Sequence, residues 1–145
     1  MKKIAIGCDH GGFDLKNAVI AHLKEKGYEV KDYGTYSKES CDYPEFGHAV
    51  GKAVASGEAD QGIVICTTGI GISIAANKIK GIRAALCTNS LLAEMTRLHN
   101  DANVLALGAG IVGEGLAMNI VDTFLTTEFS GEERHERRIK KIEEV

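Results

Sequence analysis

The sequence predicts an α/β protein, a Rossmann-like three-layer sandwich in which helices cover both faces of a five-stranded parallel sheet. Apolar runs of strand length alternate with helical segments five times along the 145 residues, and this order requires a parallel sheet between two helical layers. Runs such as GIVIC and NVLALG are apolar without interruption, as expected of strands buried on both faces. The length fits one domain over residues 1–145.

The first half of the chain supplies two strands and two helices. Strands are expected at residues 3–8 and 28–33, and helices after Gly12 to residue 26 and from Pro44 to about residue 56. Leu15, Val19 and Leu23 recur at helical spacing in the first helix. Pro44, the only proline, suits the first turn of the second helix. The polar segment 37–43 is expected to be a loop.

The second half continues the alternation. Strands are expected at residues 61–66, 82–87 and 104–107, and helices from the loop at 67–71 to about residue 78 and at 88–100, 113–127 and 132–145. Two glycines, Gly69 and Gly71, stand in the loop after the first of these strands. Asn89 or Ser90 could cap the helix that follows the fourth strand. The last helix is highly charged and contains the stretch RHERR.

Composition excludes several classes of function. The net charge is −3 and Trp is absent, which argues against nucleic-acid and membrane-surface partners. No apolar run approaches the roughly 20 residues of a membrane span, and the chain opens on a core strand without the apolar region of a signal peptide. The four cysteines form no C-x-x-C pair. We therefore expect a cytoplasmic protein with reduced thiols and no metal site.

Ligands of such sheets bind outside the carboxyl ends of the strands. The predicted strand ends offer Cys8-Asp9-His10, Cys66 to Gly71, Cys87 to Asn89 and Gly108 to Gly110. The glycines do not follow the dinucleotide pattern G-x-G-x-x-G, no G-K-[ST] follows them, and Ile72 stands where a tyrosine-phosphatase loop needs arginine. No cofactor is therefore expected.

Cys66 lies at the start of a glycine loop that leads into a helix, in the stretch CTTGIGISIAANK. Backbone N–H groups and the positive end of a helix would stabilise an anionic oxygen there and favour a thiolate. A thiolate beside such a loop can attack a carbonyl or remove a proton next to one. A small buried hydrophobic residue remains an equally open interpretation of Cys66.

Three other features combine reactive residues, and each also has an interpretation without function. Asp9-His10 places a carboxylate beside an imidazole, or forms a turn in which the Asp caps a helix. His99-Asn100 ends a helix, where a cation suits the dipole. Arg134 and Arg138 share one helix face, where like charges repel unless a dianion lies between them. The plainer interpretation of that segment is a solvated charged helix.

At these residues the sequence resembles the type B ribose-5-phosphate isomerases, a family that includes the galactose-6-phosphate isomerase subunits. The resemblance rests on GCDHGG after the first strand, DYP at 42–44, C-x-TGIG-x-SIAANK, HNDANVLALGA and RHERR. It covers essentially the whole chain, with the motifs in the same order. It implies a single sugar-phosphate isomerase domain that converts D-ribose 5-phosphate to D-ribulose 5-phosphate through a cis-enediolate, without metal or cofactor, in the non-oxidative pentose phosphate pathway.

The resemblance also implies roles for individual residues. Cys66 would move the proton between C2 and C1, Asp9 would bond the sugar hydroxyls or relay the O1/O2 proton, and His99 would open the furanose ring with help from Tyr43. The implied catalytic residues are Cys66, Thr68, His99 and Asp9, and the implied substrate-binding residues are His10, Tyr43, Thr67, Gly69, Ile70, Gly71, Ser73, Asn100, Arg134 and Arg138.

The family further implies a homodimer with sites shared between subunits, and a tetramer remains open. His10, Arg134 and Arg138 would bind the phosphate of the phosphorylated aldose or ketose, and the two arginines would reach the site of the other subunit. This arrangement would give the charged last helix a function.

Two positions depart from the family pattern. Thr67 stands where the family usually has glycine, so a positive φ at this position, or crowding of the ligand by the side chain, would lower activity. Gly110 stands where many members have a phosphate-binding arginine. The absence of that arginine would weaken phosphate binding or leave room for a longer sugar. Both departures affect the expected substrate more than the expected reaction.

Two other functions stay open. One is isomerisation of a six-carbon sugar phosphate, such as allose 6-phosphate or galactose 6-phosphate; the pair His99-Asn100 favours the ribose and allose branch of the family. The other is a non-catalytic sugar-phosphate binding module, because a fold does not by itself imply a function. The presence of Cys66 argues against the binding module.

Overall fold

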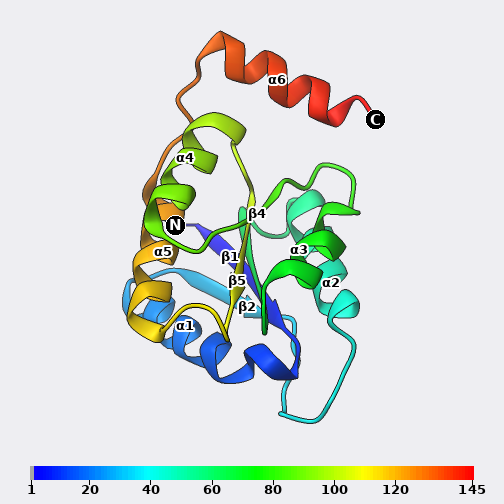
Figure 1. The fold of residues 1–145 in the computed structure, drawn as a ribbon, viewed down its shortest axis with the longest axis vertical. Coiled ribbons are helices and arrows are strands. Elements are labelled where there is room, and N and C mark those ends of the chain that lie inside the picture. The colour runs from blue at the N-terminus through cyan, green and yellow to red at the C-terminus, as the bar shows by residue number, and fades with distance from the viewer. Residues whose placement is uncertain (1) are drawn as a thin grey trace.

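The protein is an α/β sandwich with a five-stranded parallel sheet, so the predicted fold class is confirmed. The computed structural model describes residues 2–145 (Figure 1). The strands are β1 (Lys3–Cys8), β2 (Glu29–Asp32), β3 (Gln61–Cys66), β4 (Ala84–Leu86) and β5 (Val104–Gly108), in the sheet order β2-β1-β3-β5-β4. The helices are η1 (His10–Gly12, a 3₁₀ turn), α1 (Phe13–Glu25), α2 (Tyr43–Ala55), α3 (Ile70–Asn77), α4 (Ser90–Asn100), α5 (Glu114–Thr126) and α6 (Glu133–Glu143).

The sheet has a separate hydrophobic core on each face. On one face, α1, α4 and α5 cover side chains of the central strands, with Phe124 among the largest buried residues. On the other face, α2 and α3 pack through residues such as Val50 and Ile72. The central strand β3 is buried along its whole length because it lies beneath helices on both sides.

The two edge strands are shorter than predicted from residues 28–33 and 82–87. Strand β2 pairs only with β1, and β4 pairs only with β5 over three residues. Before β4, the N–H of Ile82 donates to the carbonyl of Ile79, and the N–H of Arg83 donates to the side chain of Asn103. These local hydrogen bonds replace the ladder, so the strand begins later than its apolar sequence suggests.

The parallel strands give the molecule two distinct ends. We call the side of the sheet where the strands end the carboxyl edge, and the opposite side the amino edge. Since β3 has six residues, the two edges lie roughly 17 Å apart. Helix α4 runs back from the carboxyl edge and ends at Asn100. The Nε of Arg83, the residue just before β4, donates to the carbonyl of Asn100 at 2.9 Å. The end of α4 therefore lies at the amino edge.

Helix α6 also lies at the amino edge, outside the two helical layers (Figure 1). Arg83 Nη1 pairs with Glu143 near the end of α6 at 2.9 Å, and α6 packs against α4. Of the helices in residues 2–145, none combines the length and the apolar character that crossing a membrane requires.

Candidate active site

Cys66 is the last residue of β3, and its side chain faces the start of α3. The residue is buried, at 5% exposure, and its Sγ accepts a hydrogen bond from the N–H of Gly69 at 3.1 Å. Gly69 has φ +78, and a side chain there would overlap the backbone of Gly108, so only glycine suits this turn. The sequence therefore brings the thiol to the positive end of a helix, as predicted.

The other predicted loop residues surround this turn. The N–H of Ile70 donates to Thr68 Oγ1 at 3.2 Å, and Ser73 Oγ donates to the carbonyl of Ile70 at 2.7 Å. The ring of Tyr43, the first residue of α2, lies against Gly71, where a Cβ atom would approach Tyr43 Cζ to 2.6 Å. Within residues 2–145 the N–H of Gly71 donates to no protein acceptor, so it is free to donate to an anionic oxygen of a ligand.

Thr67 follows Cys66 without backbone strain. Among residues 2–145, Asp101 is the only non-glycine residue with a positive φ, so Thr67 does not adopt the conformation that would favour glycine. The N–H of Gly110 donates to the carbonyl of Thr67 at 2.8 Å, which joins the loop after β3 to the loop after β5.

Asp9 and His10 lie beside this loop, at the end of β1. Asp9 is buried, and its Oδ1 accepts from the N–H groups of Gly11 at 2.9 Å and Gly12 at 3.2 Å. It thus caps the turn and keeps its second oxygen for other partners. The N–H of Cys41 donates to His10 Nδ1 at 3.2 Å, so the proton of a neutral His10 lies on Nε2.

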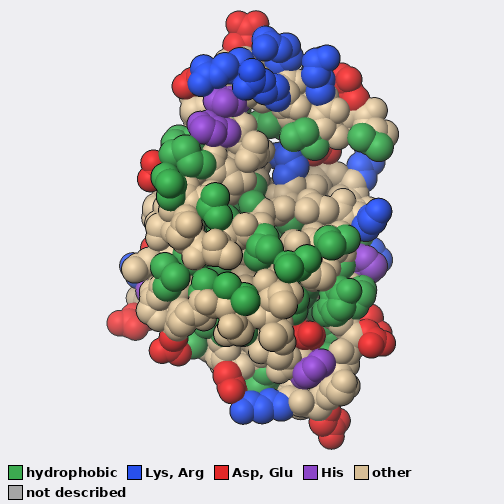
Figure 2. Space-filling model, in the orientation of Figure 1, with side chains coloured by type: hydrophobic (Ala, Val, Ile, Leu, Met, Phe, Trp, Pro, Cys, Tyr) green, Lys and Arg blue, Asp and Glu red, His purple; other side chains and the backbone are tan. Residues whose placement is uncertain are grey.

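The remaining predicted residues lie at the amino edge. The rings of His99 and His135 are stacked, with centroids 4.4 Å apart and an angle of 19° between their planes. Asn100 Oδ1 accepts from Thr96 Oγ1 at 3.0 Å. Arg134 is exposed and pairs with Glu132. Figure 2 shows lysine and arginine side chains gathered over α6, with histidines at their border.

The predicted site residues therefore form two groups at opposite edges of the sheet. The carboxyl-edge group contains Asp9, His10, Tyr43, Cys66, Thr67, Thr68, Gly69, Ile70, Gly71 and Ser73. The amino-edge group contains His99, Asn100, Arg134 and Arg138. One copy of the chain does not bring the two groups together, so a site that used both would need residues from two copies.

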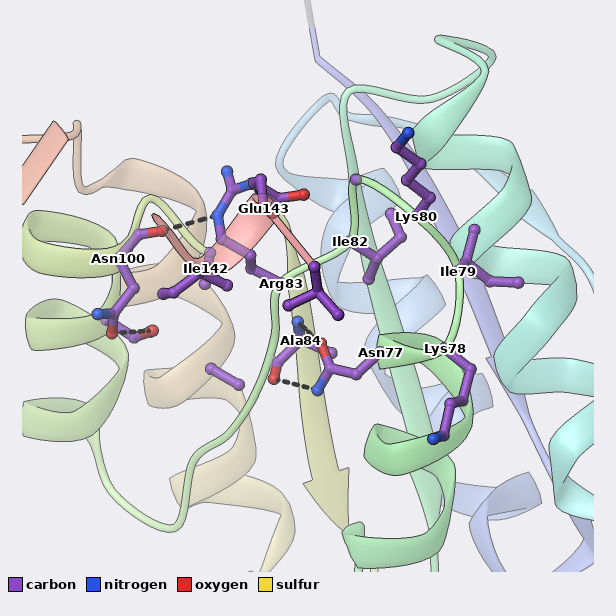
Figure 3. Close-up of a pocket in the computed structure, with 15 residues that line it drawn as sticks. Asn77, Lys78, Ile79, Lys80, Ile82, Arg83, Ala84, Asn100, Ile142 and Glu143 are labelled. Carbon is purple, nitrogen blue, oxygen red and sulfur yellow. Dashed lines mark hydrogen bonds and ion pairs between the residues drawn. The ribbon is translucent and has the colours of Figure 1, made fainter. Parts of the chain in front are cut away.

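A cleft of about 690 Å³ opens at the amino edge, between α6, the end of α4 and the segment before β4. Figure 3 shows Arg83 at its centre, hydrogen-bonded to Asn100 and close to Glu143. The cleft lies far from Cys66, but it borders the second group of predicted residues.

Sequence reasoning missed two residues that shape the amino edge, His135 and Arg83. His135 is 6% exposed, and its Nε2 has no hydrogen-bond partner within residues 2–145. Burial first, and then the positive charge of Arg134, lowers its pKa from the ordinary value of 6.5. The spacing of His135, Ile139 and Ile142, three to four residues apart, was the signal for the inner face of α6.

Two of the other cysteines, Cys8 and Cys87, lie buried in the hydrophobic core. Burial raises the pKa of Cys8 to about 12 and that of Cys87 to about 11, so both stay neutral thiols. All four cysteines are free. Within residues 2–145 no three His, Cys, Asp or Glu side chains form a group that could hold a metal ion.

A thiol beside the N–H of Gly71, which has no acceptor within residues 2–145, lies at the carboxyl edge of a parallel sheet. This arrangement suits the class of α/β enzyme that stabilises an oxyanion during carbonyl chemistry. Comparison with known proteins narrows this class. The Ribose/Galactose Isomerase family model matches residues 4–142, and the chain belongs to this family. The resemblance seen in the sequence is thereby confirmed.

Individual relatives match along almost their whole length. Ribose-5-phosphate isomerase B of Escherichia coli is 54% identical over 98% of this chain and 95% of its own. The structure of Clostridium thermocellum ribose-5-phosphate isomerase B superimposes with a TM-score of 0.96 at 61% identity, covering 98% of this chain and 95% of that one. The galactose-6-phosphate isomerase subunit LacB of Clostridium acetobutylicum is 46% identical over 98% of this chain and 82% of its own.

Proposed function

We propose that this protein is an aldose–ketose isomerase that interconverts D-ribose 5-phosphate and D-ribulose 5-phosphate through a cis-enediolate. The observation that carries the proposal is the contact of Cys66 Sγ with the N–H of Gly69, beside the free N–H of Gly71. This geometry offers a base and an oxyanion site side by side. The family and the similar ribose-5-phosphate isomerases support the same reaction.

The chemical step follows from this geometry. The Cys66 thiolate takes the proton from C2 of the open-chain aldose, and the electron pair of the broken C–H bond forms the C1–C2 double bond of the enediolate. The negative charge then lies on O1, where the N–H of Gly71 stabilises it. Asp9 relays the proton between O2 and O1, and Cys66 returns its proton to C1 to give the ketose.

Phosphate binding combines both edges of the sheet. His10 keeps the protonated Nε2 to donate to the phosphate, because its Nδ1 already accepts from the N–H of Cys41. Arg134 and Arg138 of the partner subunit complete the phosphate site in a homodimer, and His99 of the partner subunit opens the furanose ring with Tyr43. The separation of the two groups within one chain supports this arrangement.

The expected cellular compartment follows from the chemistry of the Cys66 thiol. Cys66 must stay reduced to act as a base, which suits the cytoplasm. The substrate and product belong to the non-oxidative pentose phosphate pathway, and proton transfer by a thiolate requires no metal ion.

The test is a ketose-formation assay on chelator-treated protein with ribose 5-phosphate, allose 6-phosphate and galactose 6-phosphate. We expect turnover of ribose 5-phosphate, and a loss of about 100- to 10,000-fold in kcat for Cys66→Ala, the usual contribution of a positioned base. Cys87→Ala is the matched control: it also removes a buried thiol but should keep activity. Full activity of Cys66→Ala would refute the proposed base.

A six-carbon substrate is the second candidate, because the LacB subunit shares 46% of the sequence. The same assay decides between them by the ratio of kcat/KM for the three sugars. If the sugars bind without any turnover, the protein is a binding module and the isomerase proposal fails.

A further inference from the structure

The side chain of Thr67 lies in a slot between two glycines from other loops. A Cβ atom on Gly11 would overlap Thr67 Oγ1, and a Cβ atom on Gly110 would lie 3.1 Å from Thr67 Cγ2 and 3.1 Å from the carbonyl oxygen of Thr67. The hydroxyl therefore faces the turn after β1, and the methyl faces the loop after β5. A side chain on Gly11 would displace the hydroxyl of Thr67, and one on Gly110 would require a shift of a few tenths of an ångström.

The slot lies beside Cys66 at the carboxyl edge. Thr67 is the residue after Cys66, and it is exposed. Its hydroxyl lies beside Gly11, and Gly11 directly follows His10, the residue that would bind the phosphate. The hydrogen bond from the N–H of Gly110 to the carbonyl of Thr67, at 2.8 Å, fixes the position of the slot.

This geometry changes the expectation for Gly110. Absence of a side chain at this position does not simply leave room, because the methyl group of Thr67 occupies the adjoining space. Thr67 and Gly110 are therefore coupled.

We propose that Thr67 determines substrate specificity through its side chain: the hydroxyl binds the phosphate-bearing end of the substrate, and the methyl group limits the pocket to a five-carbon chain. This inference rests on the proposed function, since it needs the C2 end of the sugar at Cys66 and the phosphate near His10. A hydroxyl donating to a phosphate oxygen makes a charge-assisted hydrogen bond.

Two nearly isosteric variants separate the hydroxyl from the methyl group. Thr67→Val keeps the shape and removes the hydroxyl, so we expect KM for ribose 5-phosphate to rise about tenfold with kcat within about twofold, as for loss of one hydrogen bond to a charged group. Thr67→Ser keeps the hydroxyl and removes the methyl group. It should leave KM for ribose 5-phosphate unchanged and raise the relative kcat/KM for allose 6-phosphate about tenfold, the usual effect of one methyl group.

Thr88→Val is the matched control, since Thr88 is an exposed threonine at the same edge of the sheet but outside the slot. Its kinetics should equal those of the wild type. If KM of Thr67→Val equals that of the wild type, the hydroxyl does not bind the phosphate end. If Thr67→Ser leaves the ratio of the two sugars unchanged, the methyl group does not limit chain length. A wild type inactive on all sugars would instead refute the proposed function.

The coupling has its own test in a double-mutant cycle. Gly110→Ala alone should raise KM for ribose 5-phosphate, because the new Cβ atom pushes on Thr67. In the Thr67→Gly background the same substitution should raise KM by a smaller factor, since the contact with Cγ2 is gone and only the contact with the backbone carbonyl of residue 67 remains. Equal effects of Gly110→Ala on KM in both backgrounds would show that the two positions are independent and would contradict the proposed coupling of Thr67 and Gly110.

Discussion

The two edges of the sheet are built differently, although both carry predicted site residues. At the carboxyl edge, Cys66 and Asp9 are buried at the ends of central strands, and backbone N–H groups hold both side chains. At the amino edge, Arg134 and Arg138 extend from an exposed helix that is held mainly by the stacked His135 and by the pair formed by Glu143.

This difference separates two tasks. Proton transfer needs a base fixed to within a fraction of an ångström, which strand ends and glycine turns provide. Attraction of a dianion needs only charge at the right end of the pocket, and mobile arginines on a surface helix can supply it. Under the proposed function, the carboxyl edge supplies the base for proton transfer, and the amino edge supplies the arginines that attract the phosphate and the His99 that opens the ring.

Complementation between inactive variants tests whether the two edges act together across subunits, and it has the largest expected effect. Cys66→Ala and Arg138→Ala should each be impaired alone. Coexpressed, they should recover about a quarter of wild-type activity, since half of the dimers are mixed and each mixed dimer has one intact site. Cys66→Ala with Asp9→Asn, both at the carboxyl edge, is the control and should recover nothing. Recovery in the control, or none in the first pair, would contradict the shared site.

The charge of the amino edge can be tested residue by residue. Arg138→Ala should lower kcat/KM for ribose 5-phosphate by about 10- to 100-fold, the value of one hydrogen bond between charged groups. Arg137→Ala removes the same charge from the neighbouring residue on a different face of α6 and should change kcat/KM by less than about twofold. Steady-state kinetics at fixed ionic strength measures both, and equal losses would mean that only the net charge of the helix matters.

Anchoring of α6 should matter less than its charge. Glu143→Gln weakens the pair with Arg83, whose side chain is 18% exposed. We expect KM to rise about fivefold at nearly constant kcat, which corresponds to about 1 kcal/mol for a partly exposed ion pair. Lys140→Gln, a substitution on the same helix but away from this pair, serves as the control. A fall in kcat instead of a rise in KM would place Arg83 in the chemical step.

The smallest expected effect is a pH dependence of the docking of α6. The pKa of His135 is lowered by burial and by Arg134, His99 and Arg138, while Glu132 acts in the opposite direction. As the pH falls, His135 therefore takes up a proton in the unfolded state before it does so in the folded state. Its contribution to the stability of the docked α6 is complete above about pH 6.5 and is lost as the pH falls below that value. Limited proteolysis of α6 at pH 7.5 and 5.5 should show faster cleavage at the lower pH. His135→Phe, which keeps the stacked ring, should abolish the difference; cleavage independent of pH in the wild type would contradict the prediction.

The sequence was informative where local pattern decides structure. Uninterrupted apolar runs predicted the central strands β3 and β5, and the glycines that follow Cys66 predicted the turn that Gly69 makes with φ +78. The lengths of the edge strands were wrong because hydrogen bonds from Arg83 and its neighbours, distant in sequence, decide where the ladder begins.

Three-dimensional proximity could not be read from spacing alone. The fit of Thr67 between Gly11 and Gly110 joins three loops, and no local pattern links those positions. The stack of His99 on His135 joins two helices 36 residues apart in the chain. Thr67 and Gly110 were noticed separately and His135 was missed, and only the fold showed which residues lie together.

The separation of the two edges has an evolutionary consequence. Because the carboxyl-edge and amino-edge groups share no residues and are separated by the full length of the strands, a substitution at one edge need not disturb the geometry of the other. If the site is shared between subunits as proposed, one copy could lose its thiol after gene duplication and the other its arginines, and a mixed pair would still assemble one complete site. Subunits that are inactive alone and active together are therefore an accessible outcome for this architecture.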